Sequence, residues 1–231
     1  MKKTILTYLP LAMILIGIIA LYLSGIYNLL TFDYIKEKYT ILLNYTHQHP
    51  FLSAFYFLSI YIVSVCLIIP DSILLSLIAG FLFPLPLAIF YIVLSETLGA
   101  MLFFLAVREA FIQVHLKPKF PQSNYLEKKF NTAPAPFLLF FRFSHLLPFW
   151  IINFAAVCLR VKKSTFFWTT LIGVIPLAVL LAQEGMGLSH YFNTHVTFSI
   201  DDLFNTQMKI TLIGLGIIAL IPVCIKTFRK R

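Results

Sequence analysis

The chain has 231 residues, of which 60% are hydrophobic and 12% are charged, and its mean hydropathy is +0.89. Soluble domains average about 25% charged residues, so this composition excludes an ordinary soluble domain and predicts a multi-pass membrane protein with one membrane domain. The formal net charge of +9 comes from basic residues in short connections and at both ends of the chain. That placement is typical of membrane proteins and argues against a nucleic-acid partner.

The first apolar run covers residues 4–27 and follows Lys2 and Lys3. It is longer than the ~7–15-residue core of a secretory signal, and no A-x-A site follows it. We interpret it as an uncleaved membrane span that enters from the cytoplasm. Residues 31–49 mix charges with apolar residues at roughly helical spacing, which fits an interfacial helix and a connecting loop equally well.

Two apolar stretches come next, 51–69 and 72–83, and Pro70 and Asp71 separate them. The second stretch has 12 residues, too few for the ~20 that a spanning helix needs. It therefore forms either one arm of a re-entrant hairpin or a short buried helix. The run 87–107 that follows is long enough to span.

The basic residues decide how the segment 51–83 is threaded. If this segment enters and leaves from the outer side, 14 of the 18 Lys and Arg residues fall on the inner side and 3 on the outer side. If 51–69 spans instead, these numbers are exchanged. The positive-inside rule therefore favours the hairpin. After a basic connection, 108–134, the same reasoning makes 135–159 a second hairpin that enters from the cytoplasm and is broken at Pro148. Spans at 165–187 and 207–225 complete the chain.

The predicted fold is an all-α membrane protein with an inverted repeat of two re-entrant helical hairpins. A transmembrane helix follows each hairpin, and N- and C-terminal transmembrane helices flank the repeat, as in transporters. LIAGF after Pro70 and FAAVC after Pro148 form a faint echo at an offset of about 77 residues. The chain is predicted to have four parts: an N-terminal helix (1–30), an interfacial segment (31–50), the core (51–190), and a C-terminal helix with a basic tail (191–231). We expect both termini in the cytoplasm and the protein in the cell membrane.

Arg142 lies in one of the most apolar stretches of the chain, RFSHLLPFWIIN at 142–153. An arginine at mid-bilayer costs ~2.5–3.5 kcal/mol, so it needs an anionic partner or water. Beside the break at Pro148, its guanidinium and the exposed helix N-termini can bind a phosphate. The alternative is an internal ion pair with Asp71 or Glu96 that holds the two hairpins together, and the sequence leaves both open.

Asp71 and Glu96 are the candidate proton carriers, because a buried carboxyl group near an arginine can take up or release a proton as its pocket opens. The alternative for Glu96 is a neutral acid bonded to a neighbouring helix. His145 either tunes the response to pH or, as we favour, makes a structural hydrogen bond. We expect Asn153 to satisfy backbone carbonyls freed by the helix break.

The sequence predicts neither a metal nor a cofactor. Its three cysteines lie far apart without a CxxC pair or a nearby His at ligand spacing. It contains no G-x-S-x-G, no HExxH and no phosphate-cradling glycine loop. We therefore do not expect an enzyme.

Three stretches, IPDSILLSLIAGFLF, SETLGAMLFFLAVRE and LLFFRFSHLLPFWIINFAAVCLRVKKSTFFWTTLIGVIP, resemble the VTT-domain, or DedA, superfamily over roughly residues 45–190. The branch they resemble most is that of the SNARE-associated Golgi proteins, which has bacterial members. The resemblance implies movement of phospholipids or polyprenyl phosphates between leaflets, in some members coupled to protons. It maps Arg142, Pro148 and Asn153 onto the family's second hairpin, and Asp71 onto the acidic residue of its first.

The sequence departs from the family pattern at three points. His145 replaces a usual proline, Val157 replaces a usual glycine, and Asp71 follows Pro70 without an intervening glycine. Each change affects the expected geometry of a hairpin tip.

The predicted function is translocation of lipids that carry an anionic phosphate headgroup, either phospholipids or polyprenyl phosphates, with protons and further copies of the chain as other candidate partners. A structural or adaptor protein is the main alternative, and an intramembrane enzyme acting on lipid phosphate is the weaker one. The predicted transport residues are Arg142, Asp71, Glu96, His145 and Asn153, and those predicted to set the hairpin geometry are Pro70, Gly80 and Pro148.

Overall fold

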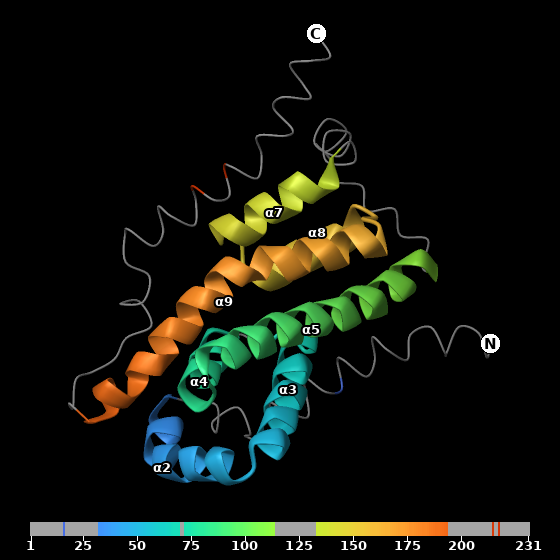
Figure 1. Cartoon of the computed structure of the whole chain (residues 1–231). Helices are drawn as coiled ribbons and strands as arrows, with labels where there is room; N and C mark the ends of the chain where they lie inside the picture. The colour runs from blue at the N-terminus through green and yellow to red at the C-terminus, as the bar shows by residue number, and fades with distance from the viewer. Residues whose placement is uncertain are drawn as a thin grey trace. The chain divides into compact units, whose positions relative to one another are not determined.

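The computed structural model describes residues 16, 32–69, 72–113, 133–193, 214 and 217. Within them the chain is all-helical, which confirms the all-α part of the predicted fold class. The helices are α2 (Phe32–Gln48), α3 (Pro50–Cys66), α4 (Ser72–Leu82), α5 (Leu85–Gln113), α7 (Pro134–Ser144), α8 (Phe149–Cys158) and α9 (Lys163–Asn193) (Figure 1). The spans predicted at 4–27 and 207–225 lie outside the described residues, apart from single positions.

In the described part of the chain, two helical stretches are long and apolar enough to cross a membrane. They are Leu85–Glu109 of α5 and Lys163–Gly187 of α9, each 25 residues long. Thr40–Gln48 and Pro50–Cys66 together meet the same criterion, but they are bent by 119° at their break. Helices α4 and α8 are apolar but shorter.

The long helices extend past the apolar runs that predicted them. Helix α5 continues to Gln113, so the first residues of the predicted connection 108–134 are helical. Helix α9 continues to Asn193, beyond residue 187, at which the predicted span ends. Backbone hydrogen bonding does not require apolar side chains, so a helix can continue beyond the apolar segment that crosses the membrane. Of the two alternatives for residues 31–49, the structure has the helix, α2.

The turns after α3 and α7 each contain a non-glycine residue with a left-handed backbone. Ile68 has φ 59° and His145 has φ 49°, and the two lie 77 positions apart in the chain. A left-handed backbone costs an L-residue roughly 1–2 kcal/mol. Proline cannot adopt it, because its ring fixes φ near −65°. Histidine in place of the proline usual in the family thus permits the turn seen at position 145.

Helices α3 and α8 end in the same hydrogen-bonded motif. At α3 the N–H of Ile69 donates to the carbonyl of Ser64 at 3.0 Å, and at α8 the N–H of Val161 donates to the carbonyl of Ala156 at 3.0 Å. In this motif the residue after the C-cap takes the left-handed conformation, for which glycine is preferred. Arg160 holds that position at α8, with φ 53°.

We expect Arg160→Gly to stabilise the protein by about 1 kcal/mol relative to Arg160→Ala, because only glycine adopts this backbone without a Cβ penalty. Both variants lose the same exposed side chain, so the comparison isolates the backbone effect. Thermal unfolding in detergent measures the difference. Equal unfolding temperatures would show that the turn at Arg160 is not strained.

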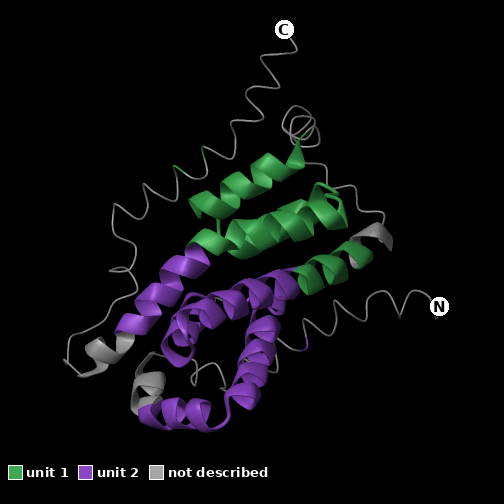
Figure 2. Ribbon diagram, viewed as in Figure 1, with its two compact units in different colours: residues 1–11, 101–176, 204–231 green, residues 12–100, 177–203 purple. Residues whose placement is uncertain are grey.

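The chain divides into two compact units (Figure 2). Unit 1 comprises 1–11, 101–176 and 204–231, and unit 2 comprises 12–100 and 177–203. Helix α5 passes from unit 2 to unit 1 after Ala100, and helix α9 passes from unit 1 to unit 2 after Pro176.

In unit 2, α2 packs on α3 and α4, and α3 packs on α4. Aromatic rings line this core edge to face: Phe57 with Tyr61 at 5.7 Å, Phe57 with Phe83 at 5.4 Å, and Phe83 with Tyr91 at 5.1 Å. In unit 1, α7 packs on α8, and the rings of Phe104 and Phe166 stack at 4.2 Å. Apolar burial of this kind supplies each unit with a core of its own.

Candidate functional site

Arg142 lies in the last turn of α7, and its side chain is 2% exposed. One guanidinium nitrogen, Nη2, donates a hydrogen bond to Oδ1 of Asn153 in α8 at 3.1 Å. The guanidinium carbon lies 5.0 Å from the centre of the Phe149 ring and 5.3 Å from that of Phe166. The hydrogen bond and the two ring contacts hold the planar cation in one orientation inside unit 1.

Gly173 of α9 makes room for the stem of Arg142. A Cβ atom at position 173 would lie 2.6 Å from Cδ and 2.8 Å from Cβ of Arg142, closer than real Cβ atoms approach. This glycine was not among the predicted site residues, because nothing in the local sequence shows which side chain lies against it. Helices α7, α8 and α9 thus each supply part of the Arg142 pocket.

The other residues predicted in the second hairpin lie in the turn that joins α7 and α8 or in α8 itself. Oδ1 of Asn153 accepts a bond from Arg142, whereas we expected Asn153 to serve backbone carbonyls. His145 is exposed, and its Nδ1 lies 3.3 Å from the carbonyl of Phe143, a local contact consistent with a structural role. Pro148 forms the N-cap of α8, with φ −52° and ψ 140°.

Glu96 belongs to unit 2, where it is 9% exposed. Its Oε1 lies 2.9 Å from the hydroxyl of Tyr61, a fully buried residue of α3. The same hydroxyl lies 2.7 Å from Oγ of Ser76 and 3.0 Å from the carbonyl of Ser72, both in α4. Tyr61 was not among the predicted site residues, because it is one of eleven tyrosines and carries no distinguishing spacing.

Further buried hydroxyl groups line the interior of unit 2. Ser95 and Thr97 flank Glu96 in the chain, and Ser53 and Ser64 lie on α3. None of the four has a hydrogen-bond partner among the described residues. Buried polar groups normally have a hydrogen-bond partner, and in such positions that partner is commonly an ordered water molecule.

Two of the predicted contacts remain predictions. Pro70 and Asp71 lie outside the described residues. Arg142 belongs to unit 1 and Glu96 to unit 2. The expected proximity of Arg142 to Asp71 or Glu96 therefore remains a prediction.

Gly80 lies in α4, where it allows close packing against α9 within unit 2. A Cβ atom at position 80 would lie 2.0 Å from the carbonyl oxygen of Ala182. A Cβ at Gly185 would lie 2.2 Å from the carbonyl oxygen of Leu77. The two backbones approach each other through small residues, as is common between membrane helices.

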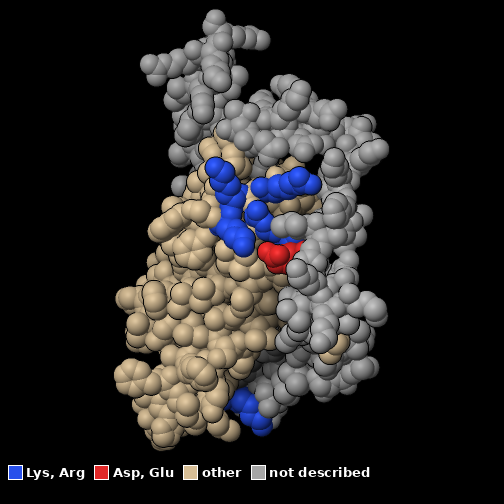
Figure 3. Space-filling view, turned by 90° about the vertical axis from the view of Figure 1, so that its right-hand side faces the viewer, with Lys and Arg blue, Asp and Glu red and all other residues tan. Residues whose placement is uncertain are grey.

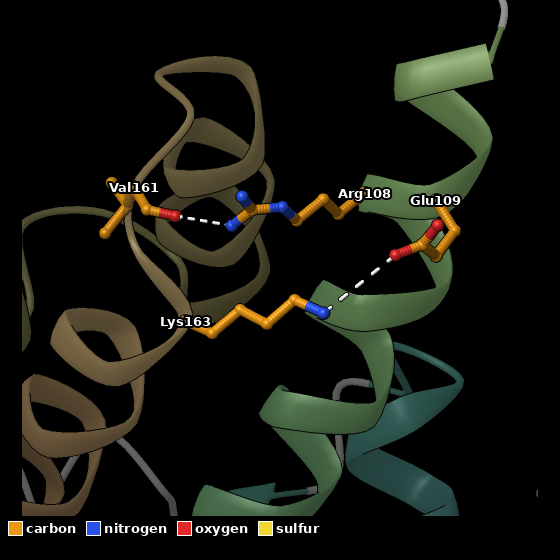
Figure 4. Close-up of polar contacts among 4 residues, drawn as sticks. All are labelled: Arg108, Glu109, Val161 and Lys163. Carbon is orange, nitrogen blue, oxygen red and sulfur yellow. Dashed lines mark hydrogen bonds and ion pairs between the residues drawn. The ribbon is translucent and has the colours of Figure 1, made fainter.

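One face of the molecule shows Lys and Arg side chains gathered around an acidic one (Figure 3). In unit 1, Nη1 of Arg108 donates to the carbonyl of Val161 at 2.7 Å, and Nζ of Lys163 lies 4.0 Å from Oε1 of Glu109 (Figure 4). We call Arg108, Arg160, Lys162 and Lys163 the basic edge. The ion pair is about half exposed and contributes at most ~1 kcal/mol, whereas the Arg108 bond ties α5 to the turn between α8 and α9.

Residues 69–186, just over half of the chain, match the family model of the VTT domain. The chain is 29% identical to the "Transmembrane protein 41 homolog" of Caenorhabditis elegans over 162 residues, which are 68% of this chain and 63% of that protein. It is 30% identical to "Transmembrane protein 41B" of Gallus gallus over 158 residues, 67% of this chain and 56% of that protein. It therefore spans less than two thirds of these relatives' length. No solved structure matches it.

Proposed function

The chain belongs to the VTT-domain family of multi-pass membrane proteins, and from this premise we propose that it moves lipids with an anionic phosphate headgroup between the two leaflets. Phospholipids and polyprenyl phosphates share this chemistry. We further propose that the protein alters no covalent bond of the lipid and is therefore not an enzyme.

The buried Arg142 is the observation that carries this proposal. Its guanidinium is 2% exposed and is oriented by Asn153 and by two aromatic rings. A cation in an interior of low dielectric attracts an anion far more strongly than the same cation in water. A guanidinium held in a fixed orientation also matches the oxygens of a phosphate, which it can bind through two parallel hydrogen bonds.

The proposed inverted repeat is supported by how the two halves correspond along the chain. The left-handed residues Ile68 and His145 are 77 positions apart, as are the first residues of α4 and α8, Ser72 and Phe149. In each half a long apolar helix follows, α5 or α9. Inverted repeats in transporters supply the two access states that movement between leaflets requires.

Each long helix has a glycine or a proline near the position at which it passes from one unit to the other. Gly99 precedes the position at which α5 leaves unit 2, and Pro176 lies where α9 leaves unit 1. A proline inside a helix removes one backbone hydrogen bond and favours a kink. We propose that the kink favoured at Pro176 lets α9 bend during transport.

We propose that the basic edge faces the cytoplasm, that both termini lie there, and that the protein resides in the cell membrane. The support is the positive-inside rule, applied to basic residues that unit 1 brings to one turn and one helix end.

Leaflet exchange in liposomes that contain only this protein tests the proposed function. Fluorescent anionic phospholipid should become accessible to an external quencher faster than in empty liposomes, while mass spectrometry finds the lipid unchanged. Exchange no faster than in empty liposomes across a panel of anionic lipids would contradict the proposal. A chemically altered lipid would indicate an enzyme instead.

The contacts of Arg142 also support a second candidate, a structural or adaptor membrane protein. Asn153, Phe149 and Phe166 lie within unit 1, so these contacts alone give the arginine a structural role. The two candidates differ in the liposome assay, because an adaptor leaves exchange at the level of the bare membrane.

We expect Glu96→Gln to flatten the pH dependence of exchange more than it lowers the maximal rate. Glutamine keeps the size and the hydrogen bonding of a neutral acid but cannot titrate. Exchange measured at several pH values checks this, with Glu184→Gln, an exposed carboxyl of α9, as the matched control. A pH profile unchanged in Glu96→Gln would remove Glu96 from any proton coupling.

A further inference from the structure

The hydroxyl group of Tyr61 joins three helices of unit 2. It lies 2.9 Å from Oε1 of Glu96 in α5, 2.7 Å from Oγ of Ser76 and 3.0 Å from the carbonyl oxygen of Ser72, both in α4. All three distances are within hydrogen-bond range. Tyr61 and Ser76 are fully buried and Glu96 nearly so.

Three hydrogen bonds need three hydrogens, and the protonation of Glu96 decides whether they are present. Tyr61 and Ser76 bring one hydroxyl hydrogen each, and the carbonyl of Ser72 brings none. If Glu96 is ionised, two hydrogens serve three contacts, and one contact is left without a hydrogen bond. If Glu96 is protonated, its O–H and that of Ser76 donate to Tyr61, and Tyr61 donates to Ser72. Every contact in this geometry is then a hydrogen bond.

We propose that Tyr61, Glu96, Ser76 and the carbonyl of Ser72 form a proton-binding site, in which the proton on Glu96 determines where Tyr61 directs its own hydrogen. With the proton bound, Tyr61 donates to Ser72 and so ties α3 to the first turn of α4. When Glu96 loses its proton to solvent, Tyr61 turns its hydrogen to the carboxylate, a stronger acceptor. Tyr61 keeps its hydrogen throughout and changes only the acceptor.

The location of Ser72 gives this exchange a structural consequence. Ser72 is the first residue of α4, and Tyr61 lies in α3, so their hydrogen bond bridges the turn that contains the strained Ile68. Loss of the proton therefore releases one tie across the tip of this helix pair. The site couples proton occupancy on α5 to the closure of α3 against α4.

Among the described residues of unit 2, Tyr61 is a titratable side chain in hydrogen-bond contact with Glu96. Tyr61 comes from α3. The two groups from α4, the carbonyl of Ser72 and the hydroxyl of Ser76, do not titrate. Ser95 and Thr97, which flank Glu96 on α5, do not titrate either. Asp71, which precedes Ser72, lies outside the described residues. The other titratable side chains described in unit 2 are exposed or half-buried: Lys38, Tyr45, His47, His49, Tyr56, Cys66, Tyr91 and Glu184.

Infrared difference spectroscopy of the full chain in lipid nanodiscs, stepped through pH, tests this proposal. We expect a carboxylic-acid C=O band that is lost as the pH rises and is missing in Glu96→Gln. A tyrosine C–O band should shift with the same midpoint and be missing in Tyr61→Phe. In Tyr61→Phe the ionised Glu96 no longer accepts a hydrogen bond from the Tyr61 hydroxyl, so its ionised form is less stable. The acid band should therefore persist to a pH about one unit higher, which is a tenfold lower proton concentration.

Tyr56→Phe is the matched control, since it removes the hydroxyl of an exposed tyrosine from the same helix. Its spectra should match those of the wild type. The absence of a Glu96 acid band at every pH at which the protein is folded would overturn the proposal. An acid band that titrates without the tyrosine band would overturn the coupling. Neither readout needs lipid movement, so a protein inactive in liposomes still tests the proton site. If Tyr61→Phe does not fold, the wild type and Glu96→Gln still decide between these outcomes.

Discussion

Replacing Arg142 with alanine is expected to reduce lipid exchange in protein-only liposomes to the level of empty liposomes. A phosphate headgroup that passes the interior of unit 1 would lose its compensating cation there. The loss of an interaction of about 3 kcal/mol slows a step roughly a hundredfold. A fluorescent anionic phospholipid and an external quencher measure the effect directly.

Alanine also removes packing, so a second variant separates the charge from the volume. Arg142→Met keeps much of the stem that lies against Gly173, and it should fold yet remain inactive. Arg142→Lys keeps the charge but not the planar fork, and we expect partial activity from it. Arg160→Ala removes an exposed arginine of the same unit and should leave exchange unchanged. Full activity in folded Arg142→Met would refute a phosphate role for this residue.

The positions of the helices could be predicted from the sequence because apolar runs and prolines mark them directly. The stretches 72–83 and 87–107 correspond to α4 and α5, and the break at Pro148 separates α7 from α8. Helix ends were less predictable, as α5 and α9 show, because a helix ends where its backbone bonding ends and not where its side chains become polar.

The partners of the polar residues could not be predicted. Arg142 and Glu96 stood out because charges are rare in apolar stretches. Tyr61 and Asn153 did not, because a residue's hydrogen-bond partner depends on how separate helices pack. The close approach of Arg142 to Gly173 could not be predicted for the same reason, because the role of a helical glycine depends on which side chain faces it.

Gly80→Leu is expected to prevent unit 2 from folding. The backbone of Ala182 lies directly where a side chain at position 80 would begin, with the carbonyl oxygen 2.0 Å and the Cα 2.8 Å from an ideal Cβ. Backbone atoms cannot rotate away as a side chain does, so α4 and α9 would have to separate. This separation would also disturb Gly185, whose Cβ position lies 2.2 Å from the carbonyl oxygen of Leu77.

Even Gly80→Ala should cost about 3 kcal/mol, at the upper end of the range for overpacked cores. Size-exclusion profiles in detergent and thermal unfolding measure both variants. Gly214→Ala and Gly214→Leu are the matched controls, since a Cβ at position 214 meets nothing within 4 Å. They should leave the profile and the unfolding temperature unchanged. If Gly80→Leu gave a monodisperse protein with wild-type stability, α4 and α9 would not pack backbone to backbone at this glycine. Their approach would then have to rest on other residues of unit 2.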